Sequence, residues 1–125
     1  MPISHVQVLS VPVSDQDRAI DFYVNKLGFE LLADAPIPGM RWVMVRPPAA
    51  QTALTLVTWF DSMPAGSLKG LVVETADLDA TVAELHANGV ETTPPEDAPW
   101  GRFVMFDDPD GNGLVLQQSA WVGSA

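Results

Sequence analysis

The first half of this chain is repeated in its second half at a nearly constant spacing. Three short segments recur in the same order at offsets of 61, 61 and 60 residues: 28–32 with 89–93, 41–45 with 102–106, and 54–56 with 114–116. A single short match can arise by chance, whereas three in one order indicate two copies of a unit of about 60 residues. We therefore expect the 125 residues to form one domain built from two tandem modules.

Hydrophobic patterning predicts the same order of elements in both copies. In the first copy we expect a strand over 5–11, a helix from the capping pair Ser14-Asp15 to Gly28, and strands near 29–34, 41–46 and 53–59. In the second copy we expect a strand near 69–75, a helix from Asp77 to Asn88-Gly89, and strands near 90–93, 102–107 and 113–118. Each module is thus predicted to be βαβββ, which makes the fold α+β.

The linker between the two copies sets the module boundaries. Residues 61–67, with Pro64 and Gly66, are expected to connect module one (1–61) to module two (68–119), and a short tail (120–125) follows.

A βαβββ unit leaves one sheet face bare once its helix covers the other. Two such units can curl their bare faces around a shared cleft, so we expect a curved-sheet cavity able to hold a ligand.

Composition narrows the classes of partner. The formal net charge is −10, from six basic and sixteen acidic residues, and the basic residues form no cluster. Because binding to phosphate needs clustered Lys and Arg, we expect neither nucleic acid nor membrane as a partner. The acidity has two interpretations: it provides solubility, or it creates a field that favours cationic or amine-bearing ligands.

The remaining compositional features indicate a cytoplasmic protein. The chain has no cysteine, which excludes disulfides and thiolate chemistry. No apolar block reaches the roughly 18 to 20 residues that cross a bilayer. The N-terminal sequence has no basic region followed by an apolar stretch, so we expect no signal peptide.

Two motifs together carry a family resemblance. The first copy contains Phe22-Tyr23 followed by Leu27-Gly28-Phe29, and the second ends in residues 106–112, FDDPDGN. Over residues 3 to 119 the chain resembles the vicinal oxygen chelate superfamily of glyoxalase I, bleomycin-resistance proteins and extradiol dioxygenases. The resemblance implies a homodimer. We expect Phe22 and Tyr23 to pack rather than react, and Asp110-Gly111-Asn112 to form a tight turn that needs a positive φ.

The resemblance also allows a test for a metal site. Metal-dependent members hold four ligands on the first and last strands of each copy, and the matching positions here are His5, Thr55, Gly70 and Val115. Only His5 is a good ligand, whereas catalytic divalent sites need about three protein ligands. We therefore expect no metal and no cofactor. A shift of two residues would offer an unusual set of His5, Glu74 and Gln117.

Strand alternation sorts residues between the helix side and the cleft side of each sheet. We expect the helix side to hold Val6, Val8, Leu54, Leu56, Leu71, Val73, Leu114 and Leu116. With the aromatic residues near the strand ends, the expected ligand-binding residues are His5, Gln7, Trp42, Met44, Thr55, Val57, Trp59, Phe60, Glu74, Trp100, Phe103, Met105 and Gln117. The alternative is that the aromatic residues fill the core or a dimer interface.

These features favour a binding protein without catalysis. A cleft rich in Trp and Met suits a bulky, partly aromatic natural product, and the resemblance to drug-resistance proteins implies an antibiotic held by sequestration. One alternative is a glyoxalase-like lyase or isomerase with a degenerate or metal-independent site, in which His5 or Glu74 acts as general base. Another is a regulatory or interaction module with a self-filled cleft.

Overall fold

The structure, a computed structural model, describes residues 2–120 and divides the chain into two compact units. Unit 1 comprises Met1–Leu68 together with Pro109–Asn112, and unit 2 comprises Lys69–Asp108 and Gly113–Ala125. Each contains one βαβββ module, which confirms the predicted α+β fold of two tandem modules. Of the predicted tail, residues 121–125 lie outside the described residues.

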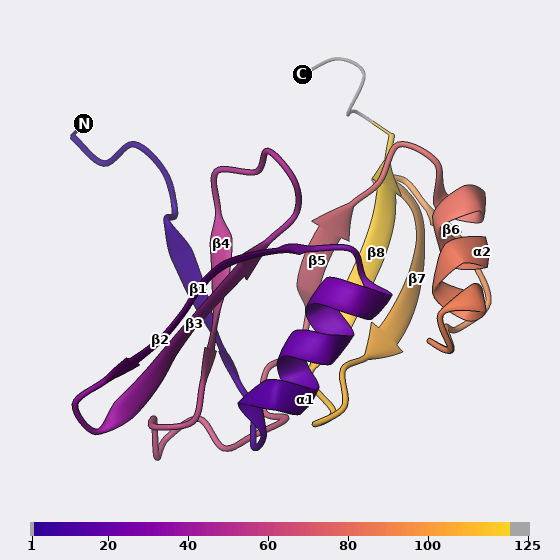
Figure 1. The fold of residues 1–125 in the computed structure, drawn as a ribbon. Coiled ribbons are helices and arrows are strands. Elements are labelled where there is room, and N and C mark those ends of the chain that lie inside the picture. Colours follow the sequence, from indigo (N-terminus) through magenta and orange to yellow (C-terminus); the bar gives the residue numbers. More distant parts are fainter. Residues whose placement is uncertain (1, 121–125) are drawn as a thin grey trace. The chain divides into compact units, whose positions relative to one another are not determined.

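Unit 1 is a four-stranded mixed sheet with one helix (Figure 1). Its elements are β1 (Val8–Pro12), α1 (Gln16–Ile20) continued by the π-helical turn η1 (Asp21–Lys26), β2 (Glu30–Ile37), β3 (Met40–Arg46) and β4 (Ala53–Val57). The strand order is β1-β4-β3-β2, with β1 parallel to β4 and the other neighbours antiparallel.

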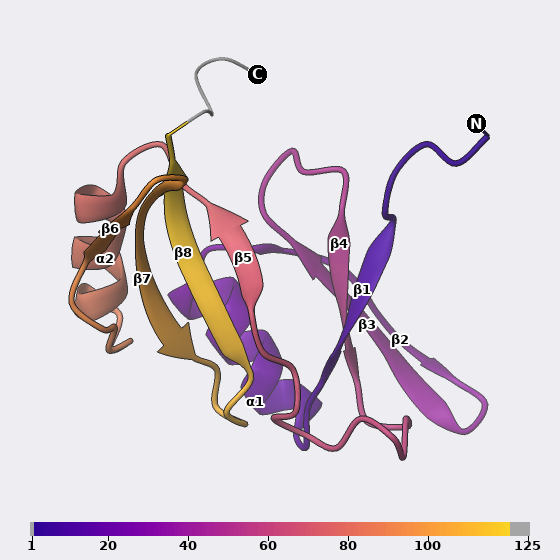
Figure 2. The same ribbon diagram turned by 180° about the vertical axis from the view of Figure 1, so that it is seen from behind.

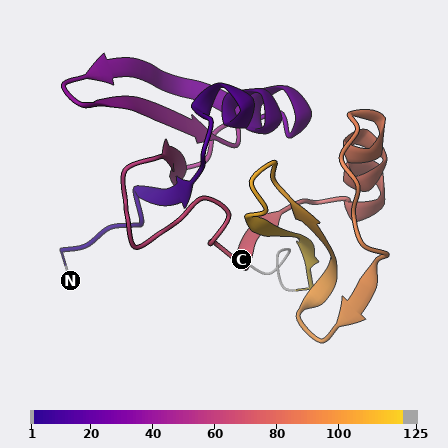
Figure 3. The same ribbon diagram turned by 90° about the horizontal axis from the view of Figure 1, so that it is seen from below.

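Unit 2 repeats this topology (Figure 2). It contains β5 (Leu71–Glu74), α2 (Leu78–Ala87), β6 (Glu96–Ala98), β7 (Gly101–Asp107) and β8 (Gly113–Ser119), in the order β5-β8-β7-β6. Strands β5 and β8 are parallel, and α2 lies beside the sheet (Figure 3). Within residues 2–120, no helix combines the length and the apolar character needed to cross a membrane.

The helices begin where the sequence predicts because an aspartate caps each one. The side chains of Asp15 and Asp77 each accept a hydrogen bond from the backbone N–H three residues later, at 3.1 Å in both helices. Gly28, directly after the first helix, has a φ of 81°, and Gly89 has a φ of 83°. Glycine adopts this left-handed conformation without steric cost, so both helices end there.

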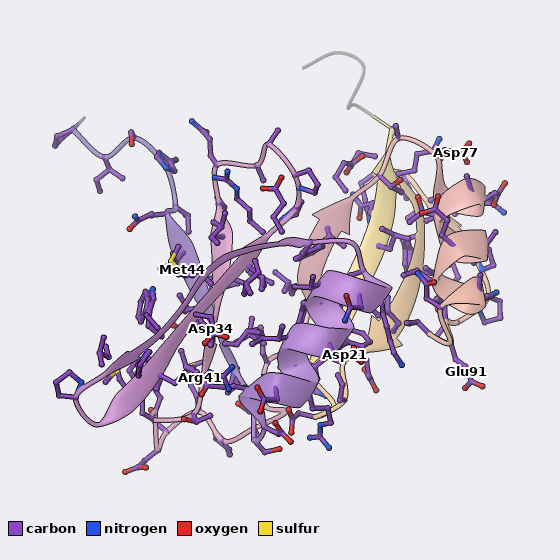
Figure 4. All side chains as sticks on the ribbon, in the orientation of Figure 1. Asp21, Asp34, Arg41, Met44, Asp77 and Glu91 are labelled. Carbon is purple, nitrogen blue, oxygen red and sulfur yellow. The ribbon has the colours of Figure 1, made fainter. Side chains whose placement is uncertain are left out.

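An arginine holds each helix against its own sheet. Arg41 on β3 donates to Asp17 on α1 at 2.9 Å and to both oxygens of Asp34 on β2 at 2.8 and 2.9 Å (Figure 4). In unit 2, Arg102 on β7 donates to Asp79 on α2 at 2.7 Å. These two arginines head the repeated segments 41–45 and 102–106, so the ion pairs belong to the repeat.

The ion pair of Arg41 leads to a prediction of pH dependence. Hydrogen bonds from Arg41 hold the pKa of Asp34 below its ordinary value of 3.8. A lowered folded-state pKa stabilises the fold above the unfolded value, and this contribution is lost as the pH falls through the folded value. We therefore expect Asp34→Asn to destabilise the protein at about pH 7, and its unfolding free energy to approach that of the parent as the pH falls below about 3.8.

Urea unfolding from about pH 7 to about pH 3 tests this prediction. The control is Glu91→Gln, which changes an exposed carboxylate and is expected to alter the unfolding free energy by less than about 0.5 kcal/mol. A difference between Asp34→Asn and the parent that stays constant over the whole range would contradict the role assigned to Asp34.

The helix side of each sheet is the core. In unit 1 the side chains of Val11, Val43, Val45 and Leu56 are fully buried. In unit 2 the corresponding side is filled by Val104, Phe106, Leu114 and Leu116, each at most 5% exposed. Phe22 and Tyr23 are also buried, and their rings meet edge to face at 5.3 Å, as expected for packing residues.

Two sequence-based expectations are wrong. The predicted strand near 90–93 is irregular, and β6 lies instead at Glu96–Ala98. Thr93 still bonds β7, with its N–H donating to the Met105 carbonyl at 2.9 Å, but Pro94 and Pro95 follow. Because proline has no N–H to donate, regular pairing begins only after them.

The second error concerns the faces of the first strand. Leu9 pairs with Leu54 and Ser10 pairs with Thr55, so Leu9 shares the helix side, and Val8 lies on the other side. The valines of this segment do not all fall on one face of the strand. Val6 is 62% exposed, whereas Val11 is fully buried, and the two are an odd number of positions apart, so that alternation assigns them to opposite faces. Leu9 and Val11 face the helix, and the regular strand begins only at Val8.

Candidate ligand-binding site

The side of each sheet that faces away from its helix carries the repeated positions of the predicted site. In unit 1, Met44 lies opposite Thr55, and in unit 2, Met105 lies opposite Val115. Directly opposed residues in antiparallel strands project from the same face. The residues next to Met44 and Met105 along their strands are buried in the cores, so Met44, Met105 and their partners lie on the helix-free faces. The registers thus agree with the predicted grouping of Met44 with Thr55.

One polar pair lies on the helix-free face of unit 1. Thr55 is 1% exposed, and its hydroxyl lies 3.2 Å from that of Ser10 on β1. The pairing satisfies both hydroxyls in an apolar setting. Sequence reasoning included Thr55 and missed Ser10, because the first strand was given the wrong phase.

Three aromatic rings form a continuous row in unit 1. Trp42 on β3 stacks with Trp59, which follows β4, at a centroid distance of 6.3 Å and an interplanar angle of 23°. The Phe60 ring lies 6.1 Å from that of Trp59, tilted by 52°. Both tryptophans are half-buried, and Phe60 is 45% exposed. We call Trp42, Trp59 and Phe60 the aromatic row; its partly open rings can stack on another flat molecule.

A pocket of about 320 Å³ adjoins the end of this row. It is formed by the ends of β1 and β4 and the segment after β4, and it is lined by Val13, Ser14, Val57, Thr58, Phe60, Asp61, Met63, Pro64 and Ala65. Phe60 therefore belongs to both the row and the pocket. Of the lining, only Val57 and Phe60 were predicted site residues, and no sequence pattern marks the others.

Unit 2 contains a chain of polar side chains on its helix-free face. Ser119 donates to Glu74 twice, from its hydroxyl to Oε1 at 2.5 Å and from its backbone N–H to Oε2 at 2.8 Å. Gln117, 7% exposed, donates from Nε2 to the Ser119 hydroxyl at 2.9 Å. The structure thus links the predicted residues Glu74 and Gln117 through Ser119. Sequence reasoning missed Ser119, although it alternates with Gln117 on β8.

Apolar side chains surround this polar chain. Phe103 and Met105 lie opposite Gln117 and Val115 on β8, and Met105 is 43% exposed. Val72 on β5, which pairs with Val115, is 52% exposed. Trp100 lies in the turn between β6 and β7 and is 51% exposed. The helix-free face of unit 2 therefore presents open apolar surface beside a fixed polar group.

His5 and Gln7 lie outside the sheets. Both are exposed and precede β1. His5 Nδ1 lies 2.8 Å from the hydroxyl of its neighbour Ser4, and the Gln7 carbonyl accepts a hydrogen bond from the Ala53 N–H at 2.9 Å. A role for either side chain in binding stays a prediction.

The register shows which residues lie beside Thr55 and Val115, two of the positions compared for a metal site. His5 and Gly70 precede β1 and β5, whereas Ser10 pairs with Thr55 and Val72 pairs with Val115. These four paired positions offer two hydroxyls and no imidazole or carboxylate, a donor set that does not fit a catalytic divalent metal. Across residues 2–120, no three His, Cys, Asp or Glu side chains are grouped so as to hold a metal ion.

Comparison with known proteins places the chain in a family. The sequence model of the Glyoxalase/Bleomycin resistance protein/Dioxygenase superfamily matches residues 3–116. The crystal structure of TnmS3, an antibiotic binding protein from Streptomyces sp. CB03234, is 54% identical with a TM-score of 0.93, over 96% of this chain and 99% of that chain.

Two further relatives support the same family assignment. A glyoxalase/bleomycin resistance protein from the same Streptomyces strain is 52% identical with a TM-score of 0.84, over 91% of this chain and all of that chain (100%). The uncharacterized protein YetH of Bacillus subtilis (strain 168) is 34% identical over 93% of this chain and 99% of its own length. The chain therefore belongs to the glyoxalase/bleomycin resistance protein/dioxygenase superfamily.

Proposed function

We propose that this protein binds a bulky, partly aromatic natural product, an antibiotic, and confers resistance by sequestering it without chemical change. The observation that carries the proposal is the aromatic row, in which three rings stay partly open instead of closing into the core. The similarity to TnmS3, named as an antibiotic binding protein, supports the same ligand class.

No specific observation favours the alternative of a lyase or isomerase. Of the two candidate general bases, His5 lies outside the sheets, and both carboxylate oxygens of Glu74 accept hydrogen bonds from Ser119. Homodimer formation and a cytoplasmic location stay predictions.

A thermal-shift screen tests the proposal. Bleomycin-type, mitomycin-type and enediyne compounds are added to the protein, and a true ligand raises the midpoint of unfolding because it binds only the folded state. Tryptophan fluorescence then follows the titration of each compound that raises the midpoint. A screen without any shift, or turnover of a compound into product, would contradict binding by sequestration.

Trp42→Ala is the variant that examines the aromatic row. Removing a central stacking ring is expected to weaken binding by at least about tenfold, because buried aromatic contacts dominate binding energies. Trp42→Phe, which keeps a flat ring, is expected to retain most of the affinity. Equal affinity of Trp42→Ala and the parent for a compound found in the screen would remove the row from the site.

A further inference from the structure

Among the described residues, the pocket at the end of the aromatic row contains one charged side chain without a hydrogen-bond or ion-pair partner, Asp61. The neighbouring Ser14 differs, because its hydroxyl donates to Asp110 at 2.5 Å and Arg18 donates to the same carboxylate at 2.9 Å. The charge of Asp110 is therefore matched by Arg18, whereas that of Asp61 is available to a ligand.

The electrostatics of the pocket favour a cation. Among the described residues that line it, none is Lys, Arg or His. The chain as a whole carries a formal charge of −10. An unmatched carboxylate in a concave site of an acidic protein attracts positive groups and repels anions. The hydroxyl of Thr58 is a further polar group of the lining.

The volume indicates what the pocket can hold. Its volume of about 320 Å³ is about ten times the roughly 30 Å³ that one molecule occupies in liquid water. Ligand-binding sites have volumes from roughly 300 Å³ upward, so this pocket is among the small ones. A whole bulky natural product does not fit, but one substituent does. Since Phe60 contributes to both the row and the pocket, a molecule stacked on the row has a neighbouring space for a side group.

We propose that this pocket is a subsite for a protonated amine substituent of the ligand, selected by Asp61. The inference rests on the proposed function, because the aromatic row has to hold the ring system whose side group enters the pocket. It narrows the ligand to flat aromatic compounds that bear an ammonium group. Asp61 acts as the counter-ion, and the Phe60 ring adds a cation–π contact if the ammonium lies over its face.

Two matched probes test the proposal: 1-pyrenemethylamine, which is protonated at neutral pH, and 1-pyrenemethanol, which has the same rings and no charge. Quenching of tryptophan fluorescence reports binding of each. We expect the amine to bind roughly two- to fivefold more tightly, the range of an exposed ion pair, and the preference to shrink as salt is added. Asp61→Asn is expected to abolish the preference and to leave the alcohol's affinity unchanged.

The control is Asp107→Asn, which makes the same change of charge at an exposed position in unit 2 and is expected to keep the preference for the amine. If both probes bind equally, or if Asp61→Asn keeps the preference, the amine subsite is wrong while the aromatic row stands. If neither probe quenches the fluorescence of the parent, the aromatic row does not bind flat rings, and the proposed function fails with the inference.

Discussion

Replacement of Leu56 by alanine is expected to lower the free energy of unfolding by about 3 kcal/mol. Leu56 is fully buried on the helix side of β4, and β4 is paired on both sides, by β1 and by β3. The Leu56 carbonyl also accepts a hydrogen bond from Gln16 on α1 at 2.8 Å, so the backbone there is held in place. Because the surroundings cannot collapse into the space, the truncation leaves a cavity in addition to the loss of buried apolar area.

Urea unfolding followed by circular dichroism measures this loss. Leu32→Ala is the matched control, since Leu32 on β2 is 40% exposed and its truncation is expected to cost less than about 1 kcal/mol. Comparable losses for the two variants would show that β4 is not the centre of the core of unit 1.

The sequence was sufficient for the order of the elements because its signals are local. Asp15 and Asp77 cap the helices, Gly28 and Gly89 end them, and all four are visible in the sequence. The first strand was assigned the wrong face because the alternation of its valines changes phase, and only the pairing with β4 shows which phase packs inward. Sequence alternation alone does not determine the sheet face when the pattern contains such a break.

Alternation predicts which candidate residues share the helix-free face only where the strands are regular. Met44 and Thr55 could be grouped from alternation, and so could Glu74 and Gln117. Alternation places Trp42 and Trp59 on the cleft side but does not predict that their rings stack, because Trp59 lies beyond the end of β4. For the same reason no pattern places residues 58, 61 and 63–65 around a pocket, since their positions depend on the turns of the linker.

Replacement of Asn112 by alanine is expected to cost about 3 kcal/mol, because it removes two hydrogen bonds of a fully buried side chain and leaves the Leu68 N–H without its partner. Asn112 has no exposed surface; its Nδ2 donates to the Pro12 carbonyl at 2.8 Å, and its Oδ1 accepts from the Leu68 N–H at 3.1 Å. The sequence predicts a positive φ in this turn, and Gly111, with a φ of 93°, confirms that prediction. The Asn112 side chain has a separate role, since it joins the end of β1 to Leu68, directly after the linker.

The test compares Asn112→Ala with Asn25→Ala by urea unfolding. Asn25 donates to Asp21 at 2.8 Å on the exposed side of the helix, and its loss is expected to cost less than about 0.5 kcal/mol. Equal costs for the two substitutions would mean that the Gly66 N–H is sufficient for the Pro12 carbonyl and that water satisfies the Leu68 N–H when the amide is removed. A large cost for Asn112 alone would show that this side chain fixes the segment after β4, the same segment that carries Asp61 and forms the pocket wall.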